Sequence, residues 1–174
     1  MTAAYPLSYI SYLSEFHATR DYFECHELLE EYWKAHQGEE FTGTWHGLIQ
    51  VAVGCYHHRR GNIGGAVKMW TSALQRLTKE HLIQLGLDGE AMLAELKYRR
   101  DALANDVAFP YSDMNLPICD PNLKDACLAL CANRGWQWGI ASEDAGEDVI
   151  HRHLTRDRSE VVAARNQAIL ERGR

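Results

Sequence analysis

The stretch TGTWHGLIQVAVGCYHHRR, residues 42–60, decides the fold of this chain. Successive residues of an α-helix turn by about 100°, and on such a helix the apolar residues of this stretch cover most of the circumference. They are Trp45, Leu48, Ile49, Val51, Ala52, Cys55 and Tyr56. A helix that is apolar nearly all round is buried among its neighbours. We therefore expect residues 42–60 to form the central helix of an all-α protein.

Glycines give this central helix one unusual face. Gly47 and Gly54 are seven residues apart and share that face. Glycine within a helix lowers its stability, so the pair indicates a place where another backbone approaches closely. Thr42 is placed to cap the start of the helix, and Gly61 is placed to end it.

Polar side chains form a second feature of the central helix. His46, Gln50 and His57 follow one another at spacings of four and seven residues, which places them in a single stripe. A buried polar group without a hydrogen-bond partner costs about 1–3 kcal/mol. The partners of this stripe are therefore expected on a neighbouring helix.

The preceding helix offers such partners. Asp21 and Glu24 form a capping box that starts a helix at Tyr22, and Gly38 ends it after about Gln37. His26 and Glu30, four residues apart, lie at the edge of the apolar stripe of this helix. If the two helices pack side by side, these side chains converge with the polar stripe.

Three interpretations of this polar cluster stay open. His26, Glu30 and His57 are a ligand set for a divalent metal ion, the one cofactor that we consider. The same groups, with His46, Gln50 and Glu27, can instead form a closed hydrogen-bond network that is purely structural. In the third interpretation, His26 or His57 works against Glu30 in acid–base chemistry.

The remaining helices complete the predicted fold. We expect helices at residues 6–19, from an Asn62 cap to about residue 77, at 89–105 after an Asp88 cap, from Asp120–Pro121 to about 135, and at about 149–171. Short connections favour antiparallel neighbours. The prediction is a compact antiparallel helical bundle at residues 1–108. A Pro-punctuated connector and C-terminal helices that pack on this core follow at 109–174.

Several segments together resemble a known family. They are YFECHELLEEYW (22–33), GLIQ (47–50), Tyr56-His57, Arg60-Gly-Asn62 and Gly65-Ala66. Over residues 12–80 the chain is similar to the family catalogued as domain of unknown function 309, which comprises small bacterial and archaeal proteins. The resemblance implies a compact helical bundle and no particular activity. The positions that match the family's pattern are His26, Glu27, Glu30, Trp33, Gln50, His57 and Asn62.

Composition limits the function classes. The net charge of −6 is uneven: residues 149–174 carry six Arg against three acidic residues, which leaves −9 for residues 1–148. An acidic body argues against nucleic-acid binding, and no apolar run is long enough to span a membrane. The five Cys, in a chain without a secretory signal, indicate reduced thiols in the cytoplasm.

These observations favour a helical scaffold or protein-interaction module. The last helix has a weakly apolar side formed by Val161, Val162, Ala164, Ala168, Ile169 and Leu170. Such a side packs on the body, on a second copy of the chain or on another protein, so we expect a homodimer or a protein partner. The alternative is a metal-binding protein or metal-dependent hydrolase that uses the cluster between the second and third helices.

Overall fold

The structure is a computed structural model that describes residues 5–145 and 147–150. Its elements, in chain order, are α1 (Leu7–Ser14), η1 (Glu15–Thr19), α2 (Tyr22–Ala35), α3 (Thr42–Arg59), α4 (Ile63–Arg76), α5 (Lys79–Gln84), α6 (Gly89–Asn105), α7 (Pro121–Asn133), η2 (Ser142–Asp144) and α8 (Glu147–Ile150). Within these described ranges there is no β-strand, although one isolated bridge joins Leu87 to Ile118. The prediction of an all-α fold is confirmed.

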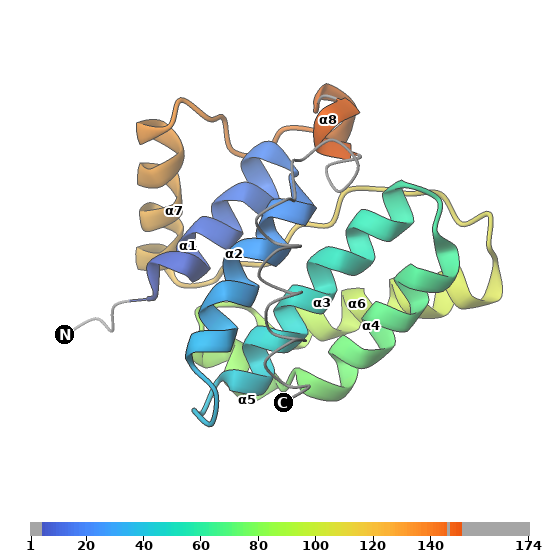
Figure 1. The fold of residues 1–174 in the computed structure, drawn as a ribbon, viewed down its shortest axis with the longest axis horizontal. Coiled ribbons are helices and arrows are strands. Elements are labelled where there is room, and N and C mark those ends of the chain that lie inside the picture. Colours follow the sequence, from blue (N-terminus) through green and yellow to red (C-terminus); the bar gives the residue numbers. More distant parts are fainter. Residues whose placement is uncertain (1–4, 146, 151–174) are drawn as a thin grey trace, which may run out of the picture.

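The central helix is α3, which packs against α2 on one side and α4 on the other (Figure 1). Trp33 at the end of α2 meets His46 near the start of α3, with ring centroids 4.5 Å apart. Phe23 at the start of α2 meets Tyr56 near the end of α3, at 5.7 Å. Because the start of one helix lies against the end of the other, α2 and α3 are antiparallel, as the sequence predicts.

The glycine face of α3 receives α4. A Cβ atom at Gly47 would lie 2.7 Å from the Leu77 side chain, and one at Gly54 would lie 2.2 Å from the indole of Trp70. The expected close approach therefore exists, and the atoms nearest to both positions belong to side chains. Large apolar side chains fill the space, because a buried indole needs a flat surface without a Cβ atom to rest on.

Most of the predicted helix starts are confirmed. The side chains of Asp21, Asn62, Asp88 and Asp120 each accept a hydrogen bond from a backbone N–H of the first turn that follows. The predicted Thr42 cap is wrong, since Thr42 is the first helical residue. Its hydroxyl instead donates to the His36 carbonyl (2.7 Å) and accepts from the Glu39 N–H (2.9 Å), which fixes the loop between α2 and α3.

The first predicted helix, residues 6–19, is two elements. The α-helix stops at Ser14, and Glu15–Thr19 form a π-helical turn in which the Arg20 N–H bonds to the Glu15 carbonyl at 2.9 Å. Arg20 then takes a left-handed backbone conformation, with φ of 55°. That conformation is costly for a residue with a side chain, so other contacts must hold it there.

The connector and α7 share the hydrophobic core of the earlier helices. Met114, Leu116, Leu123 and Cys127 belong to one buried cluster with residues from α1 to α6. The short helix α5 is an element that the sequence pattern does not predict. The predicted helix at 149–171 lies outside the described residues except for its first two positions, Val149 and Ile150, which end α8. No helix in the described ranges is both long and apolar enough to cross a bilayer.

Candidate functional site

A groove lies between the start of α2 and the end of α3. It encloses about 170 Å³, and we refer to it as the α2–α3 groove. Its lining residues are Tyr22, Phe23, His26, Val53, Tyr56, His57 and Arg60. The lining is mainly aromatic and aliphatic, with two imidazoles and one guanidinium among the apolar groups. Antiparallel packing of α2 and α3 thus brings His26 and His57 to one pocket.

His26 belongs to a short chain of charges along α2. Its Nε2 lies 2.5 Å from Oε2 of Glu30, and Nζ of Lys34 lies 2.8 Å from the other oxygen of that carboxylate. The hydrogen bond from His26 lowers the pKa of Glu30 to about 2, with Lys34 acting in the same direction and burial opposing both. A carboxylate with so low a pKa is a poor proton acceptor at neutral pH, so this geometry does not favour the acid–base interpretation.

The two ends of the stripe on α3 face α2. His46 lies against Trp33, Gln50 is buried, and His57 lines the α2–α3 groove. The structure gives Oε1 of Gln50 and Nδ1 of His26 no hydrogen-bond partner in the described part of the chain, although both atoms are buried. Within those residues, the expected hydrogen-bond network therefore leaves these two atoms unsatisfied.

The remaining predicted positions have local structural contacts. Asn62 caps α4 and lies 3.3 Å from Nδ1 of His57, and Gly61 has the positive φ of 81° that ends α3. Glu27 is half-buried on α2. In the ranges 5–145 and 147–150, no three His, Cys, Asp or Glu side chains come together in a way that could hold a metal ion. The proposed set of His26, Glu30 and His57 thus has no support from the geometry.

The histidine buried most deeply on α3 is His58, which the sequence did not single out. Its ring is surrounded by Trp70, Phe109 and Tyr111, and Nε2 donates to the Phe109 carbonyl at 3.1 Å. The carbonyl has no proton to give, so Nε2 must carry the hydrogen. Burial lowers the pKa of His58. This imidazole attaches the end of α3 to the connector.

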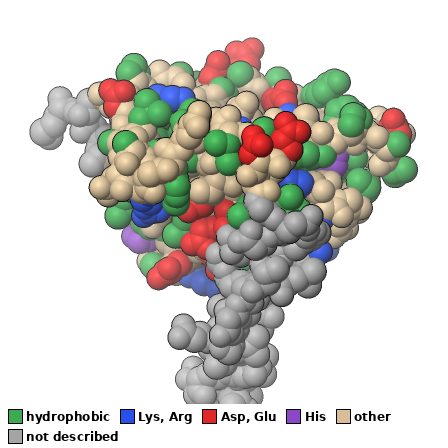
Figure 2. Space-filling view, turned by 90° about the horizontal axis from the view of Figure 1, so that it is seen from above, with side chains coloured by type: hydrophobic (Ala, Val, Ile, Leu, Met, Phe, Trp, Pro, Cys, Tyr) green, Lys and Arg blue, Asp and Glu red, His purple; other side chains and the backbone are tan. Residues whose placement is uncertain are grey.

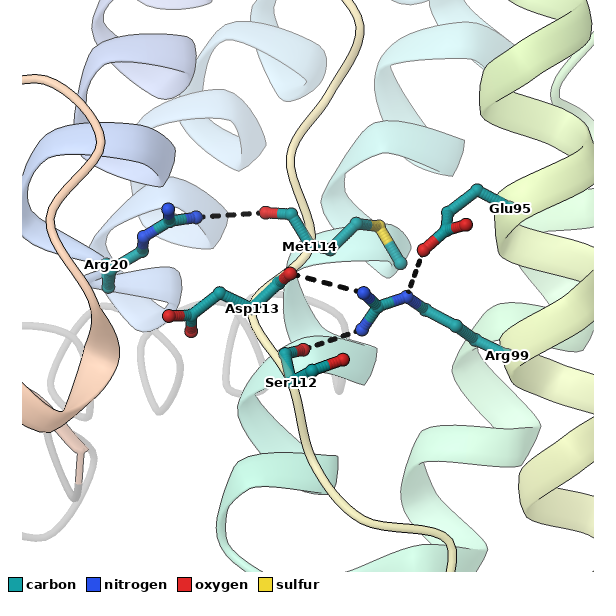
Figure 3. Close-up of polar contacts among 6 residues, drawn as sticks. All are labelled: Arg20, Glu95, Arg99, Ser112, Asp113 and Met114. Carbon is teal, nitrogen blue, oxygen red and sulfur yellow. Dashed lines mark hydrogen bonds and ion pairs between the residues drawn. The ribbon is translucent and has the colours of Figure 1, made fainter.

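Two buried arginines hold the connector from opposite sides (Figure 3). Arg99 on α6 donates to the carbonyls of Ser112 (2.6 Å) and Asp113 (3.2 Å), and its Nε pairs with Glu95. Arg20 donates to the Met114 carbonyl at 2.9 Å. An extended segment has no internal ladder of hydrogen bonds, so these guanidinium groups satisfy carbonyls that would otherwise be buried without donors.

Asp113 joins the connector to the helical core. Its carboxylate accepts hydrogen bonds from the hydroxyls of Tyr111 and Ser142 and from the Ser142 N–H. Burial raises the pKa of this carboxyl group, but the hydrogen bonds from Ser142 and Tyr111 together outweigh burial and lower it. Arg59 on α3 in turn donates to the Ser142 hydroxyl at 3.0 Å. The segment before α8 is thereby fixed to the end of α3.

Comparison with known proteins agrees with this fold. Residues 9–69 match the family model described as Domain of unknown function (DUF309). The Bacillus subtilis (strain 168) protein named Uncharacterized protein YpuF is 40% identical over 170 residues, which cover 97% of this chain and 97% of that protein. This chain belongs to the DUF309 family. No solved structure matches it significantly.

The DUF309 match places the groove within the family's defining segment. Residues 9–69 contain α2, α3 and every residue that lines the α2–α3 groove. The arginine and carboxylate contacts to the connector reach beyond that segment, to Arg99, Asp113 and Ser142. The similarity to the Bacillus subtilis protein covers nearly the whole chain, so it extends past α8 into residues 151–174.

Proposed function

We propose that this DUF309 protein is a helical interaction module. Its binding site is the α2–α3 groove, and its ligand is an amphipathic, basic helix of a polypeptide. The observation that carries this proposal is an open pocket with an apolar, aromatic lining at the contact between two helices. Such grooves accept the apolar face of a helix through side chains at positions i, i+3 or i+4, and i+7.

The size of the groove supports an apolar side chain as its ligand. An apolar cavity of about 150 Å³ can hold a molecule as large as benzene. The α2–α3 groove, at about 170 Å³, therefore has room for an anchoring Leu, Ile or Phe side chain. Val53, Phe23 and Tyr56 supply the apolar contacts, and aromatic residues of this kind are frequent at the energetic centres of interfaces.

The charges beside the groove support a basic ligand. Helix α2 carries Glu24, Glu27, Glu30 and Glu31 and has Lys34 as its only basic residue other than His26. Figure 2 shows that Asp and Glu side chains gather in several groups on one face of the molecule, with Lys and Arg between them. Acidic groups near a binding site favour a partner with Lys or Arg and speed its association.

We also propose that the protein acts in the cytoplasm. All five cysteines are free thiols, and Cys25, Cys55, Cys127 and Cys131 are buried. Burial raises the pKa of the Cys25 and Cys55 thiols, which keeps them protonated and unreactive. A chain with five unpaired thiols suits a reducing compartment.

Peptide binding tests the proposed function. A labelled model helix of about 18 residues, with Leu at i, i+3, i+4 and i+7 and Arg on the other face, should bind the intact chain with a Kd below about 1 mM by fluorescence anisotropy. The same peptide with Glu in place of Arg should bind at least about tenfold more weakly, since α2 is acidic.

A pair of protein variants ties that binding to the groove. Val53→Glu places a charge in the apolar lining and should abolish binding of the basic peptide. The matched change Val107→Glu, at a residue that is 72% exposed in the connector after α6, should leave binding unchanged. Equal binding by the two variants, or no difference between the two peptides, would disprove a groove that recognises basic helices.

A further inference from the structure

The contact between α2 and α3 continues past the α2–α3 groove (Figure 1). His26 on α2 and Val53 on α3 line the groove. Trp33 follows His26 by seven residues, and His46 precedes Val53 by seven residues. Seven residues make nearly two turns, so the two members of each pair share one face of their helix. Because the helices are antiparallel, Trp33 and His46 meet one repeat farther along, with ring centroids 4.5 Å apart.

We propose that the ligand helix binds along this whole contact and has a second anchor at Trp33 and His46. This inference rests on the proposed function and specifies the sequence pattern of the partner. The partner has an apolar side chain at position i in the groove, a Lys or Arg at i+3 or i+4, and a second apolar side chain at i+7. We refer to the groove together with Glu30, Trp33 and His46 as the α2–α3 seam.

The second anchor offers a mainly apolar surface. Trp33 and His46 are both half-buried, so part of each ring can be reached from outside. Burial lowers the pKa of His46, with Arg76 acting in the same direction and Glu30 opposing both, so the imidazole is mostly neutral at pH 7. A neutral imidazole beside an indole suits an apolar or aromatic side chain, and Trp is frequent at the energetic centres of interfaces.

A carboxylate lies between the two anchors. Glu30 follows His26 by four residues and precedes Trp33 by three, and its charge acts on the imidazoles of both His26 and His46. The hydrogen bond from His26 lowers the pKa of Glu30 to about 2, so this group is ionised at neutral pH. Its side chain is 30% exposed, and a carboxylate that bonds to His26 and Lys34 can accept further hydrogen bonds. The middle of the seam therefore attracts a basic side chain.

Another acceptor comes from the α3 side of the same region. Gln50 follows His46 by four residues and precedes Val53 by three. Its Oε1 is buried and accepts no hydrogen bond from the part of the chain that the structure describes. Burial of an acceptor without a donor is unfavourable. Lys and Arg carry several N–H donors, so a basic side chain placed between the anchors would meet acceptors from both helices.

The two anchors are unsuited to a basic side chain, which fixes the register of the ligand. The groove is lined by apolar groups such as Phe23 and Val53, and burial of a cation among them is costly. At the other anchor, the charge of Arg76 acts on His46 and would repel a second cation. A ligand shifted by one turn would move its cation away from Glu30 toward one of these ends, so the seam selects one alignment.

The spacing of the anchors matches a ligand helix that lies along α2. The anchors are seven residues apart on α2, from His26 to Trp33, which corresponds to about 10.5 Å at 1.5 Å per residue. Side chains i and i+7 of a second helix have the same separation. Reversing the ligand exchanges i+3 with i+4 and leaves this spacing unchanged, so the pattern holds for either direction.

The first test changes only the peptide. In the basic model peptide, the Leu at i+4 is exchanged with one Arg of the outer face, which keeps the composition and the net charge. This exchange should tighten binding to the intact chain about fivefold in fluorescence anisotropy, because the Arg then lies beside Glu30. Equal or weaker binding would overturn the proposed place of the basic side chain.

A double-mutant cycle tests the second anchor. Two peptides each replace one anchoring Leu, at i or at i+7, by Ala, and Trp33→Ala removes the indole from the protein. Each single change should weaken binding about tenfold, and one of the two peptides should lose nothing further against the Trp33 variant, since the same contact is already missing. Losses that multiply for both peptides would overturn the anchor. Trp136→Ala, at a half-buried Trp in the loop after α7, should leave binding unchanged.

Charge variants complete the test and separate this inference from the proposed function. Glu30→Gln should weaken binding of the exchanged peptide about fivefold, whereas Glu31→Gln, at the exposed next residue, should change it less than twofold. If Val53→Glu abolishes binding while Trp33→Ala and Glu30→Gln leave it unchanged, the extended seam is overturned and the groove stands. Failure of every peptide to bind the intact chain would refute the proposed function itself.

Discussion

Substituting Gly54 by Ala adds one methyl group where, among the described glycines, a new Cβ atom would lie closest to a neighbouring atom. The new Cβ atom would lie 2.2 Å from Nε1 of Trp70 and 2.4 Å from Cδ1, whereas an ordinary contact is at least 3.4 Å. The indole must therefore move by about 1.2 Å. Trp70 is fully buried, and its Nε1 donates to the Val51 carbonyl at 3.3 Å. A rigid ring in a packed core cannot make that movement without disturbing α3 or α4.

The expected loss of stability follows from three contributions. Overpacking in a dense core costs about 1–3 kcal/mol. Displacement of the indole weakens its hydrogen bond and leaves a buried donor unsatisfied, at about 1–3 kcal/mol. Replacing Gly by Ala within a helix returns about 1 kcal/mol. We expect Gly54→Ala to lower the free energy of unfolding by about 3 kcal/mol, which lowers Tm by roughly 6–12 °C.

Gly64→Ala is the matched control for the same chemical change. Gly64 is exposed on α4, and a Cβ atom there would meet nothing within 4 Å. The helix preference of Ala acts alone at this site, so the variant should gain about 0.5–1 kcal/mol. Urea unfolding followed by Trp fluorescence measures both changes. A Gly54→Ala protein as stable as the wild type would contradict the close packing of the Trp70 indole against α3 at Gly54.

Three further measurements test the buried polar contacts. Arg99→Met should lower the free energy of unfolding by about 2–4 kcal/mol, because two connector carbonyls lose their hydrogen-bond donor. The control Arg100→Met, at a half-buried residue, should lower it by less than about 1 kcal/mol. Equal losses for the two variants in urea titrations would contradict the contacts of Arg99 to the connector. In the same assay, His58→Ala should lower the free energy of unfolding by about 2 kcal/mol more than His57→Ala does, since His58 is 4% exposed and bonded to the connector. A larger loss for His57→Ala would contradict the buried position of His58. Burial lowers the pKa of His17 to about 4. The neutral ring therefore contributes its full stabilisation above pH 6.5, and this contribution is lost as the pH falls toward 4. An NMR titration of His17 with a midpoint near pH 6.5 would show that the ring is solvated.

The neutral form of His17 follows from its hydrogen bonds. Its Nε2 accepts the Leu116 N–H at 2.9 Å, and its Nδ1 donates to the Leu13 carbonyl at 2.8 Å. Protonation would give Nε2 a hydrogen and break the bond to the connector. The ring also stacks on Trp138, with centroids 4.4 Å apart. Nothing in the sequence near residue 17 indicates this role, because the partner at Leu116 lies 99 residues away.

The candidate groove was only partly predictable. Helical spacing correctly put His26 on α2 and His57 on α3 at the contact between these helices, since both lie at the edge of an apolar stripe. It also suggested that Glu30 would turn toward α3. In the structure Glu30 pairs with Lys34 and His26 on its own helix, because a contact four residues away costs little entropy to form. Spacing gives the face of a helix but does not choose between partners on that face.

The sequence by itself determined where most helices begin and which of them is central. Asp21, Asn62 and Asp88 bond to backbone groups three residues away, and such contacts form in any chain that turns into a helix at that point. The apolar circumference of residues 42–60 likewise required neighbours on several sides. These features depend on residues close together in the sequence, so the sequence alone predicts them.

The tertiary structure alone decided the π turn, the path of the connector and the groove. Arg20 keeps its left-handed backbone because its guanidinium bonds to Met114 and Ile140, each more than 90 residues away. Arg99 is a charged residue of a kind that is usually exposed, and its hydrogen bonds to the carbonyls of Ser112 and Asp113 make its burial favourable. Contacts of this type arise when separate helices meet, and the local pattern of a sequence does not encode which distant carbonyl a buried cation will reach.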